Sequence, residues 1–224
     1  MRKLVQSLSP SAEFAIVVLV AFGYFVVISV LAAFGRYPQA GELTDRHLIS
    51  LLIYELVLLT LLLSFLRLRG WTTDRFGIRI GAVETLTGFA LAGGDYLAYA
   101  LVVYTVYAVW PRAAYAITSP HISSPGVSLA TVIAVSIINP VFEEVFVCGY
   151  VIAALGKSRD PWVGVHVSVA IRLLYHVYQG AIAAIGVVPF GLIMAFWYRR
   201  TGRLWPVIVA HAVTDFAALL RFMQ

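Results

Sequence analysis

Residues 127–155 read VSLATVIAVSIINPVFEEVFVCGYVIAAL, an apolar run with two adjacent glutamates, Glu143 and Glu144, near its centre. About 20 apolar residues cross the hydrocarbon core of a bilayer as a helix, so the run predicts one transmembrane span. A carboxylate at the bilayer centre costs roughly 2.5 to 3.5 kcal/mol, and charges in this position usually have a function. The pair therefore predicts polar chemistry inside a membrane helix.

The rest of the chain has the same apolar character. Of its 224 residues, 61% are hydrophobic and 12% are charged, and the mean hydropathy is +0.90. Soluble domains carry about a quarter charged residues. Composition therefore predicts an all-α, polytopic transmembrane helical bundle, with residues 1–224 forming one integral membrane domain.

Apolar runs separated by breaks rich in Gly, Pro and Arg predict about seven spans, within a range of six to eight set by length. The first run is longer than the apolar core of a signal peptide, and we expect it to be retained as a span. The predicted spans are residues 13–35, 47–66, 83–109, 127–155, 161–179, 181–198 and 204–222.

Positive charge falls in alternate connections between these spans. The net charge is +5, but the basic residues lie between apolar runs, so we expect contact with lipid headgroups and no nucleic-acid partner. The positive-inside rule places the N-terminus in the cytoplasm and, with seven spans, the C-terminus outside. The single cysteine excludes an internal disulfide and a cysteine-rich metal site. The basic connections contain Arg2 and Lys3, then Arg67, Arg69, Arg75 and Arg79, then Lys157 and Arg159, then Arg199, Arg200 and Arg203.

Helical rise brings polar residues of three spans to similar depths. At about 1.5 Å per residue from the cytoplasmic ends, the two glutamates lie about 17 Å deep, His176 about 21 Å and Asp215 about 16 Å. His211 lies about 10 Å deep and shares a helix face with Asp215, since the two are separated by four residues. These five side chains are predicted to line one cavity near the midplane.

The two glutamates are expected to have different roles because adjacent helical residues are about 100° apart. Glu143 lies on the face of Asn139, and Glu144 lies on the face of Cys148. Pro140 has no N–H to donate, and we expect it to open the helix locally beside the pair.

Such a set of residues supports hydrolysis in two ways. A carboxylate can act as general base on a water, with one histidine assisting and a second histidine stabilising the oxyanion. Alternatively, Glu143, His176 and His211 can hold zinc with an open position for water. Spacing alone does not separate the two mechanisms.

Three segments carry these residues in order: Glu143-Glu144-Val145-Phe146-Val147-Cys148, Arg172-Leu173-Leu174-Tyr175-His176 and His211-Ala212-Val213-Thr214-Asp215. They resemble the motifs Glu-Glu-x-x-x-Arg, Phe-x-x-x-His and His-x-x-x-Asn/Asp of the CAAX protease and bacteriocin-processing family (CPBP, also called Abi) of intramembrane endopeptidases. The similarity covers about residues 127–220.

The resemblance implies cleavage of membrane-associated proteins or peptides within the bilayer. Glu143 is implied as the general base on a water, assisted by His176. His211 and Asp215 are implied to stabilise the oxyanion, and Glu144 to have a structural or electrostatic role. The resemblance favours this glutamate-type mechanism, with no cofactor, over zinc.

Two residues depart from the family motifs. Cys148 stands where the first motif has arginine, and Arg172 stands where the second has phenylalanine. An unpaired buried ion is costly, so we predict that Arg172 supplies from the neighbouring helix the charge that position 148 lacks.

Two other classes of function compete with a protease. One is a proton-coupled carrier using Glu143, Glu144 and Asp95 as a relay, although no inverted repeat supports it. The other is an inactive family member acting as a binding or immunity protein. Glu55 and Asp95, also inside predicted spans, are expected to support the cavity or to satisfy each other.

Overall fold

The computed structural model describes residues 5–36, 43–110, 126–156, 160, 162–180, 184–220 and 223. These residues are mostly helical and include no strand, which confirms the predicted all-α fold. The long helices are α2 (Pro10–Ala33), α3 (Asp45–Leu68), α5 (Ala82–Val109), α7 (Leu129–Glu144), α9 (Val163–His176), α10 (Ala184–Thr201) and α11 (Trp205–Leu219). The short ones are α4 (Thr73–Phe76), the π-helix η1 (Val145–Tyr150), α8 (Val151–Leu155) and the 3₁₀ helix η2 (Val177–Gln179).

Each of the predicted spans coincides with one long helix or a helical run. Four of them, α2, α3, α5 and the continuous run Leu129–Leu155, are long and apolar enough to cross a membrane. Helix α11 is apolar but shorter, so spanning by α9, α10 and α11 stays a prediction. The predicted span ends at 161, 181–183 and 221–222 lie outside the described residues, as do Arg2, Lys3, Lys157 and Arg159.

Local sequence explains where several helices begin. Ser9 precedes Pro10 and accepts a hydrogen bond from the backbone N–H of Ala12 at 3.1 Å. Ser128 likewise accepts one from the N–H of Thr131 at 3.3 Å, ahead of the helix that carries the glutamates. A hydroxyl cap and a proline in the first turn satisfy or remove N–H groups that a helix start leaves without partners.

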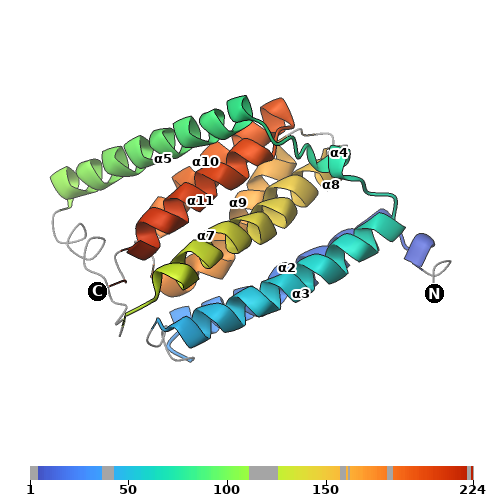
Figure 1. Cartoon of the computed structure of the whole chain (residues 1–224), viewed down its shortest axis with the longest axis horizontal. Helices are drawn as coiled ribbons and strands as arrows, with labels where there is room; N and C mark the ends of the chain where they lie inside the picture. The colour runs from blue at the N-terminus through green and yellow to red at the C-terminus, as the bar shows by residue number, and fades with distance from the viewer. Residues whose placement is uncertain are drawn as a thin grey trace.

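The helices that carry the three motifs lie in the interior of the bundle. Figure 1 shows α5 along one side and α2 with α3 along the other, with α7, α9, α10 and α11 between them. Helix α5 packs on α10 and α11, α3 packs on α7, and α2 packs on α9. The outer helices therefore shield the motif-bearing ones.

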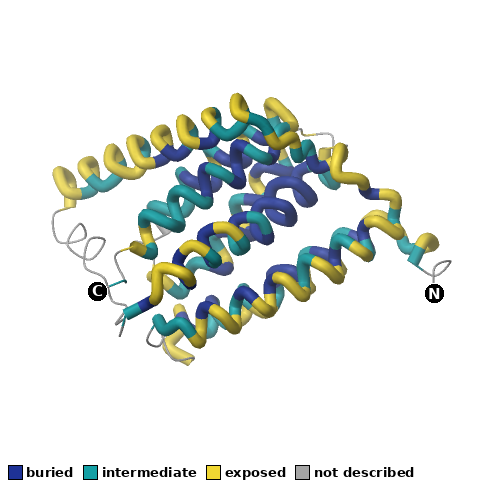
Figure 2. The backbone as a smooth tube through the Cα atoms, viewed as in Figure 1, coloured by how far each residue is buried: buried dark blue, intermediate teal, exposed yellow. Residues whose placement is uncertain are grey.

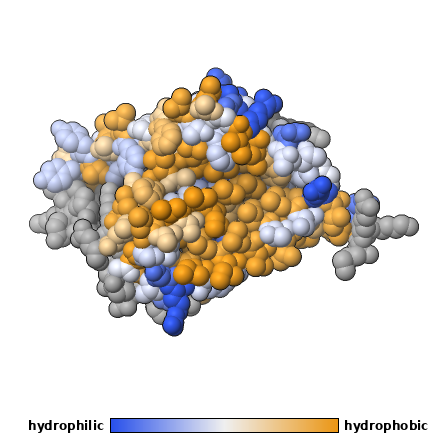
Figure 3. Space-filling view, viewed as in Figure 1, coloured by the Kyte–Doolittle hydropathy of each residue, from blue (hydrophilic) through white to orange (hydrophobic). Residues whose placement is uncertain are grey.

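Burial follows this arrangement. All residues from Val145 to Ile152 are buried, and Figure 2 shows this stretch as the darkest part of the tube. The outer helices instead expose large apolar side chains such as Leu19, Leu61 and Leu97. Figure 3 shows apolar residues across the middle of one face and hydrophilic residues gathered toward its two ends. This pattern matches a protein whose middle contacts lipid and whose ends contact water.

The irregular part of the central helix lies after the glutamate pair. The α-helix continues through Pro140 to Glu144, and the change to a π-helix begins at Val145. The predicted opening at Pro140 is therefore not where the helix changes type. Short π-helical segments are common at functional sites, because they rotate the following residues relative to the preceding turn.

Candidate active site

A buried arginine connects the two glutamates. Arg172 on α9 is 1% exposed, and its Nη2 lies 2.6 Å from Oε1 of Glu144. Its Nη1 lies 3.2 Å from Oε2 of Glu143. The predicted pairing of Arg172 with Glu144 across two helices is confirmed.

Glu144 belongs to this network through its Oε1, while its Oε2 is buried and has no hydrogen-bond partner among the described residues. Its side chain is 0% exposed, and its Oε1 also lies 2.6 Å from Nδ1 of His211 on α11. The other ring nitrogen of His211, Nε2, lies 3.4 Å from Oδ1 of Asp215. Since both nitrogens face carboxylate oxygens, the geometry favours an imidazolium, which is hydrogen-bonded to Glu144 through Nδ1 and lies at ion-pair distance from Asp215 through Nε2.

Glu143 has a different environment. Its Oε2 accepts a hydrogen bond from the Tyr175 hydroxyl at 2.5 Å, and its Oε1 accepts one from Asn139 Nδ2 at 3.3 Å. Its side chain remains 11% exposed. The angular offset between neighbouring helix positions thus separates the two carboxylates, as predicted.

A further carboxylate on α3 holds Asn139. Glu55 is 1% exposed, and its Oε1 accepts from Nδ2 of Asn139 at 2.7 Å. The amide nitrogen therefore donates to Glu55 and Glu143 together. Of the two roles expected for Glu55 and Asp95, to support the cavity or to satisfy each other, the structure contradicts the second, since the partner of Glu55 is Asn139.

Replacement of Glu55 by leucine is expected to lower cleavage by about tenfold, because Asn139 loses an acceptor and no longer fixes Glu143. Replacement by glutamine keeps a carbonyl acceptor and is expected to preserve most activity. Initial rates of the two variants on one reporter peptide test this difference. Equal losses in both variants would show that the charge of Glu55, rather than its hydrogen bond, matters.

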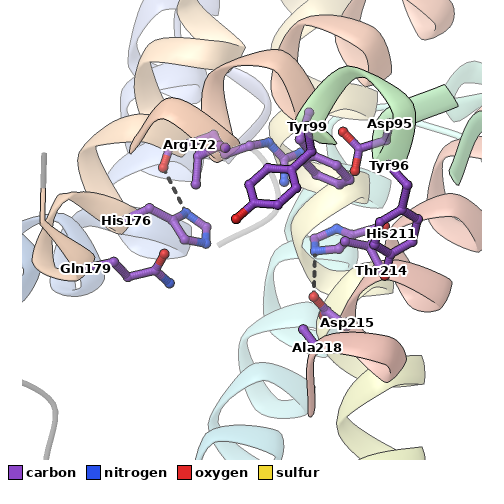
Figure 4. Close-up of a pocket in the computed structure, with 13 residues that line it drawn as sticks. Asp95, Tyr96, Tyr99, Arg172, His176, Gln179, His211, Thr214, Asp215 and Ala218 are labelled. Atoms are coloured by element: carbon purple, nitrogen blue, oxygen red, sulfur yellow. Dashed lines mark hydrogen bonds and ion pairs between the residues drawn. The ribbon is translucent and has the colours of Figure 1, made fainter. Parts of the chain in front are cut away.

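The network borders a cavity of about 320 Å³ between α5, α9, α10 and α11. Figure 4 shows side chains from these helices converging on it. Neither glutamate is among the described lining residues; both contact side chains that line it. The residues that line the cavity include Asp95, Tyr99, Arg172, His176, His211 and Asp215.

His176 lies at the wall of this cavity. Its Nδ1 is 3.0 Å from the backbone oxygen of Arg172, a contact drawn in Figure 4. A ring that donates from Nδ1 to this carbonyl keeps Nε2 as an acceptor. His176 can thus take a proton from a water or peptide group in the cavity.

The prediction that five side chains line one cavity is confirmed for His176, His211 and Asp215, whereas Glu143 and Glu144 are not among its described lining residues. Cys148 is 0% exposed, and its Sγ lies 3.9 Å from the Ser168 hydroxyl, a packing position away from the cavity. Sequence reasoning missed Tyr175 as a donor to Glu143. It also missed the link from Glu55 to Asn139. Acidic and amide side chains are rare in apolar helices, so the sequence marks Glu55 and Asn139 as unusual. It does not show which side chains they contact.

The donor set does not suit a metal ion. One ligand atom each from Glu143, Glu144 and His211 lies within 4.8 Å of the others, so this group replaces the predicted Glu143, His176 and His211. However, Oε1 of Glu144 already accepts from Arg172 and His211, both at 2.6 Å. A guanidinium bonded to both carboxylates would repel a dication at the same place. These described residues therefore do not fit a zinc ion at this position.

Comparison with known protein families supports the resemblance that the three motifs indicate. Residues 125–217 match the family model described as type II CAAX prenyl endopeptidase Rce1-like. No curated protein and no solved structure gave a match. The matched region contains α7 through most of α11, and with it all three motifs. Residues 125–217 are therefore similar to the Rce1-like CAAX protease family, which agrees with the family resemblance of the three motifs.

Proposed function

We propose that this protein is an intramembrane endopeptidase in which Glu143 activates the attacking water. The observation that carries the proposal is the difference between the two carboxylates. Glu144 is 0% exposed and paired with Arg172 and His211, whereas the Glu143 side chain is 11% exposed. Glu143 accepts three hydrogen bonds. A carboxylate has about four lone-pair sites, so one remains for water.

The other residues have complementary roles in this proposal. His176 assists proton transfer through its Nε2. His211 and Asp215 border the position where negative charge develops on the peptide oxygen, and an imidazolium there stabilises that charge. Arg172 and Glu144 hold the helices in register and fix the position of Glu143.

The substrate class follows from the family and from the setting. The matched family is named for cleavage of prenylated CAAX segments, and we infer a membrane-associated protein or peptide with a lipid-modified end. The cavity lies between helices of a membrane bundle, which suits a substrate that enters from the bilayer. The mechanism needs no cofactor, and nucleic acid is not a partner.

We further infer that the N-terminus faces the cytoplasm. Arg69 pairs with Glu13 near the start of α2, and Arg203 pairs with Glu84 near the start of α5. The backbone of Gly77 accepts a hydrogen bond from Leu204 at 3.0 Å. These contacts join the basic connections at one end of the bundle, and the positive-inside rule assigns that end to the cytoplasm.

Reconstitution in proteoliposomes separates a protease from a carrier. Purified protein is incubated with a farnesylated peptide ending in a CAAX tail, and products are identified by mass spectrometry. A pH-sensitive dye inside the vesicles reports proton flux in parallel. The proposal expects a product peptide and no flux, whereas flux without product would support the carrier.

Strong chelators are expected to leave cleavage unchanged, because the guanidinium of Arg172 occupies the place of a metal between the carboxylates. The measurement is the initial rate after prolonged dialysis against a chelator, compared with the undialysed protein. Loss of activity that returns on adding zinc would contradict the glutamate-type mechanism.

A further inference from the structure

Asp95 is a buried acid in the cavity that the proposed reaction does not use. Helix α5 is largely exposed, and its buried residues are Gly88, Ala92 and Asp95. This spacing forms the inner stripe of the helix. Asp95 is 5% exposed and lines the cavity. Among the residues that the structure describes, none lies within hydrogen-bond or ion-pair distance of its carboxylate.

The cations nearest to the cavity are already engaged. Arg172 is paired with Glu143 and Glu144, and His211 is paired with Glu144 and Asp215. Without Asp95, these pairs already contain three carboxylates and two cations. Asp95 adds a further negative charge, and a buried carboxylate without a partner is costly. A cationic group in the cavity would remove this cost.

An aromatic ring borders the same space. Tyr99 follows Asp95 by one helical turn and lines the cavity. In Figure 4 its ring lies between the side of the cavity with His176 and Gln179 and the side with Asp95. A Cβ at Gly186 would lie 3.0 Å from the Tyr99 ring, so this glycine allows the ring to lie against α10. Aromatic faces attract ammonium and guanidinium groups.

We propose that Asp95 and Tyr99 form a subsite for the lysine or arginine side chain of a substrate peptide. The proposal deepens the proposed function, on which it rests for the identity of the ligand as a substrate. Both residues precede the matched region 125–217, so the family assignment does not supply the subsite. Asp95 would bind the cation directly, and Tyr99 would cover it.

Two lipid-anchored probes test the subsite without any cleavage. Each is a dodecanoyl tripeptide with a fluorescent label, and they differ only in carrying lysine or acetyl-lysine. Binding is measured to the full chain in nanodiscs of zwitterionic lipid, with empty nanodiscs subtracted. The wild type is expected to bind the lysine probe about tenfold more tightly, as for a hydrogen bond to a charged group.

Asp95→Asn is expected to bind both probes equally, and Asp95→Glu to keep the preference. Asp74→Asn, at an exposed position on α4, is the matched control and should behave as wild type. Equal binding of both probes by the wild type overturns the proposal, as does a preference that survives in Asp95→Asn. If Asp95→Asn does not fold, the preference for the lysine probe over the acetyl-lysine probe is still measured in the wild type and in Asp95→Glu, and its absence from both overturns the proposal. This experiment measures binding alone. Failure of the proposed protease activity would be seen in the cleavage assay with the farnesylated peptide, so the two failures are distinguishable.

Discussion

Replacement of Glu143 by glutamine is expected to lower the cleavage rate by about 10²- to 10⁴-fold, the usual contribution of a general base. Glutamine retains an amide oxygen that can accept from Tyr175 or Asn139, but it cannot take a proton from water. The measurement is kcat/KM on a reporter peptide, with substrate binding followed in parallel. Binding is expected to be retained, because glutamine has nearly the size of glutamate and keeps an oxygen that accepts a hydrogen bond.

Glu84→Gln is the matched control for this prediction. Glu84 lies in the first turn of α5 and pairs with Arg203 at 2.6 Å, away from the cavity. Its activity is expected to equal that of the wild type. A Glu143→Gln protein that folds and cleaves at the wild-type rate would remove Glu143 from the reaction.

Arg172→Phe, which restores the residue of the family motif, is expected to destabilise the fold by about 3 to 5 kcal/mol. The substitution leaves Glu144, with its side chain 0% exposed, without its guanidinium partner and with His211 as the remaining cation. Breaking one side of a buried ion pair has this effect because the other charge stays in a medium of low polarity. Reversible unfolding in mixed micelles, compared with the wild type, measures the loss.

The double variant Arg172→Phe/Cys148→Arg is expected to recover part of this stability. Position 148 lies about one helical turn after Glu144, so an arginine there can reach the same carboxylate. Cys148→Arg alone is expected to destabilise, because it adds a second guanidinium to a site already neutralised by Arg172. A double variant no more stable than Arg172→Phe would show that the two positions do not exchange charge. The sign of the coupling energy between the two substitutions shows whether the positions exchange charge, since both side chains act on the carboxylate of Glu144.

Much of the fold follows from patterns along the chain. Long apolar runs define the helices, because each must satisfy its backbone hydrogen bonds internally within a bilayer. The separate roles of Glu143 and Glu144 follow from the helical angle between them, and the contact of Asn139 with Glu143 follows from the i,i+4 spacing. The pairing of Arg172 with Glu144 follows from charge, since neither ion is stable there alone.

The contacts between side chains of different helices could not be predicted from patterns along the chain. The hydrogen bonds from Tyr175 to Glu143 and from Asn139 to Glu55 depend on how α9 and α3 are rotated about their axes. Apolar helices with similar residues on all faces do not specify that rotation by pattern. The π-helix after Glu144 lies within the stretch Val145 to Ile152, whose residues are all buried, and the apolar sequence there gives no signal that distinguishes it from an α-helix. The sequence places Asp95 inside a predicted span, but its place on the cavity wall depends on how α5 packs against α10 and α11.

The role of Glu143 as the base that activates water is tested by peptide mass spectrometry of a membrane extract incubated with purified protein. Wild type, wild type with a strong chelator, Glu143→Gln and Glu84→Gln are compared in one experiment. We expect the same new peptides in every sample except Glu143→Gln, which yields none. Peptides that persist in Glu143→Gln, or that disappear from the wild type with the chelator, would contradict a water activated by this glutamate.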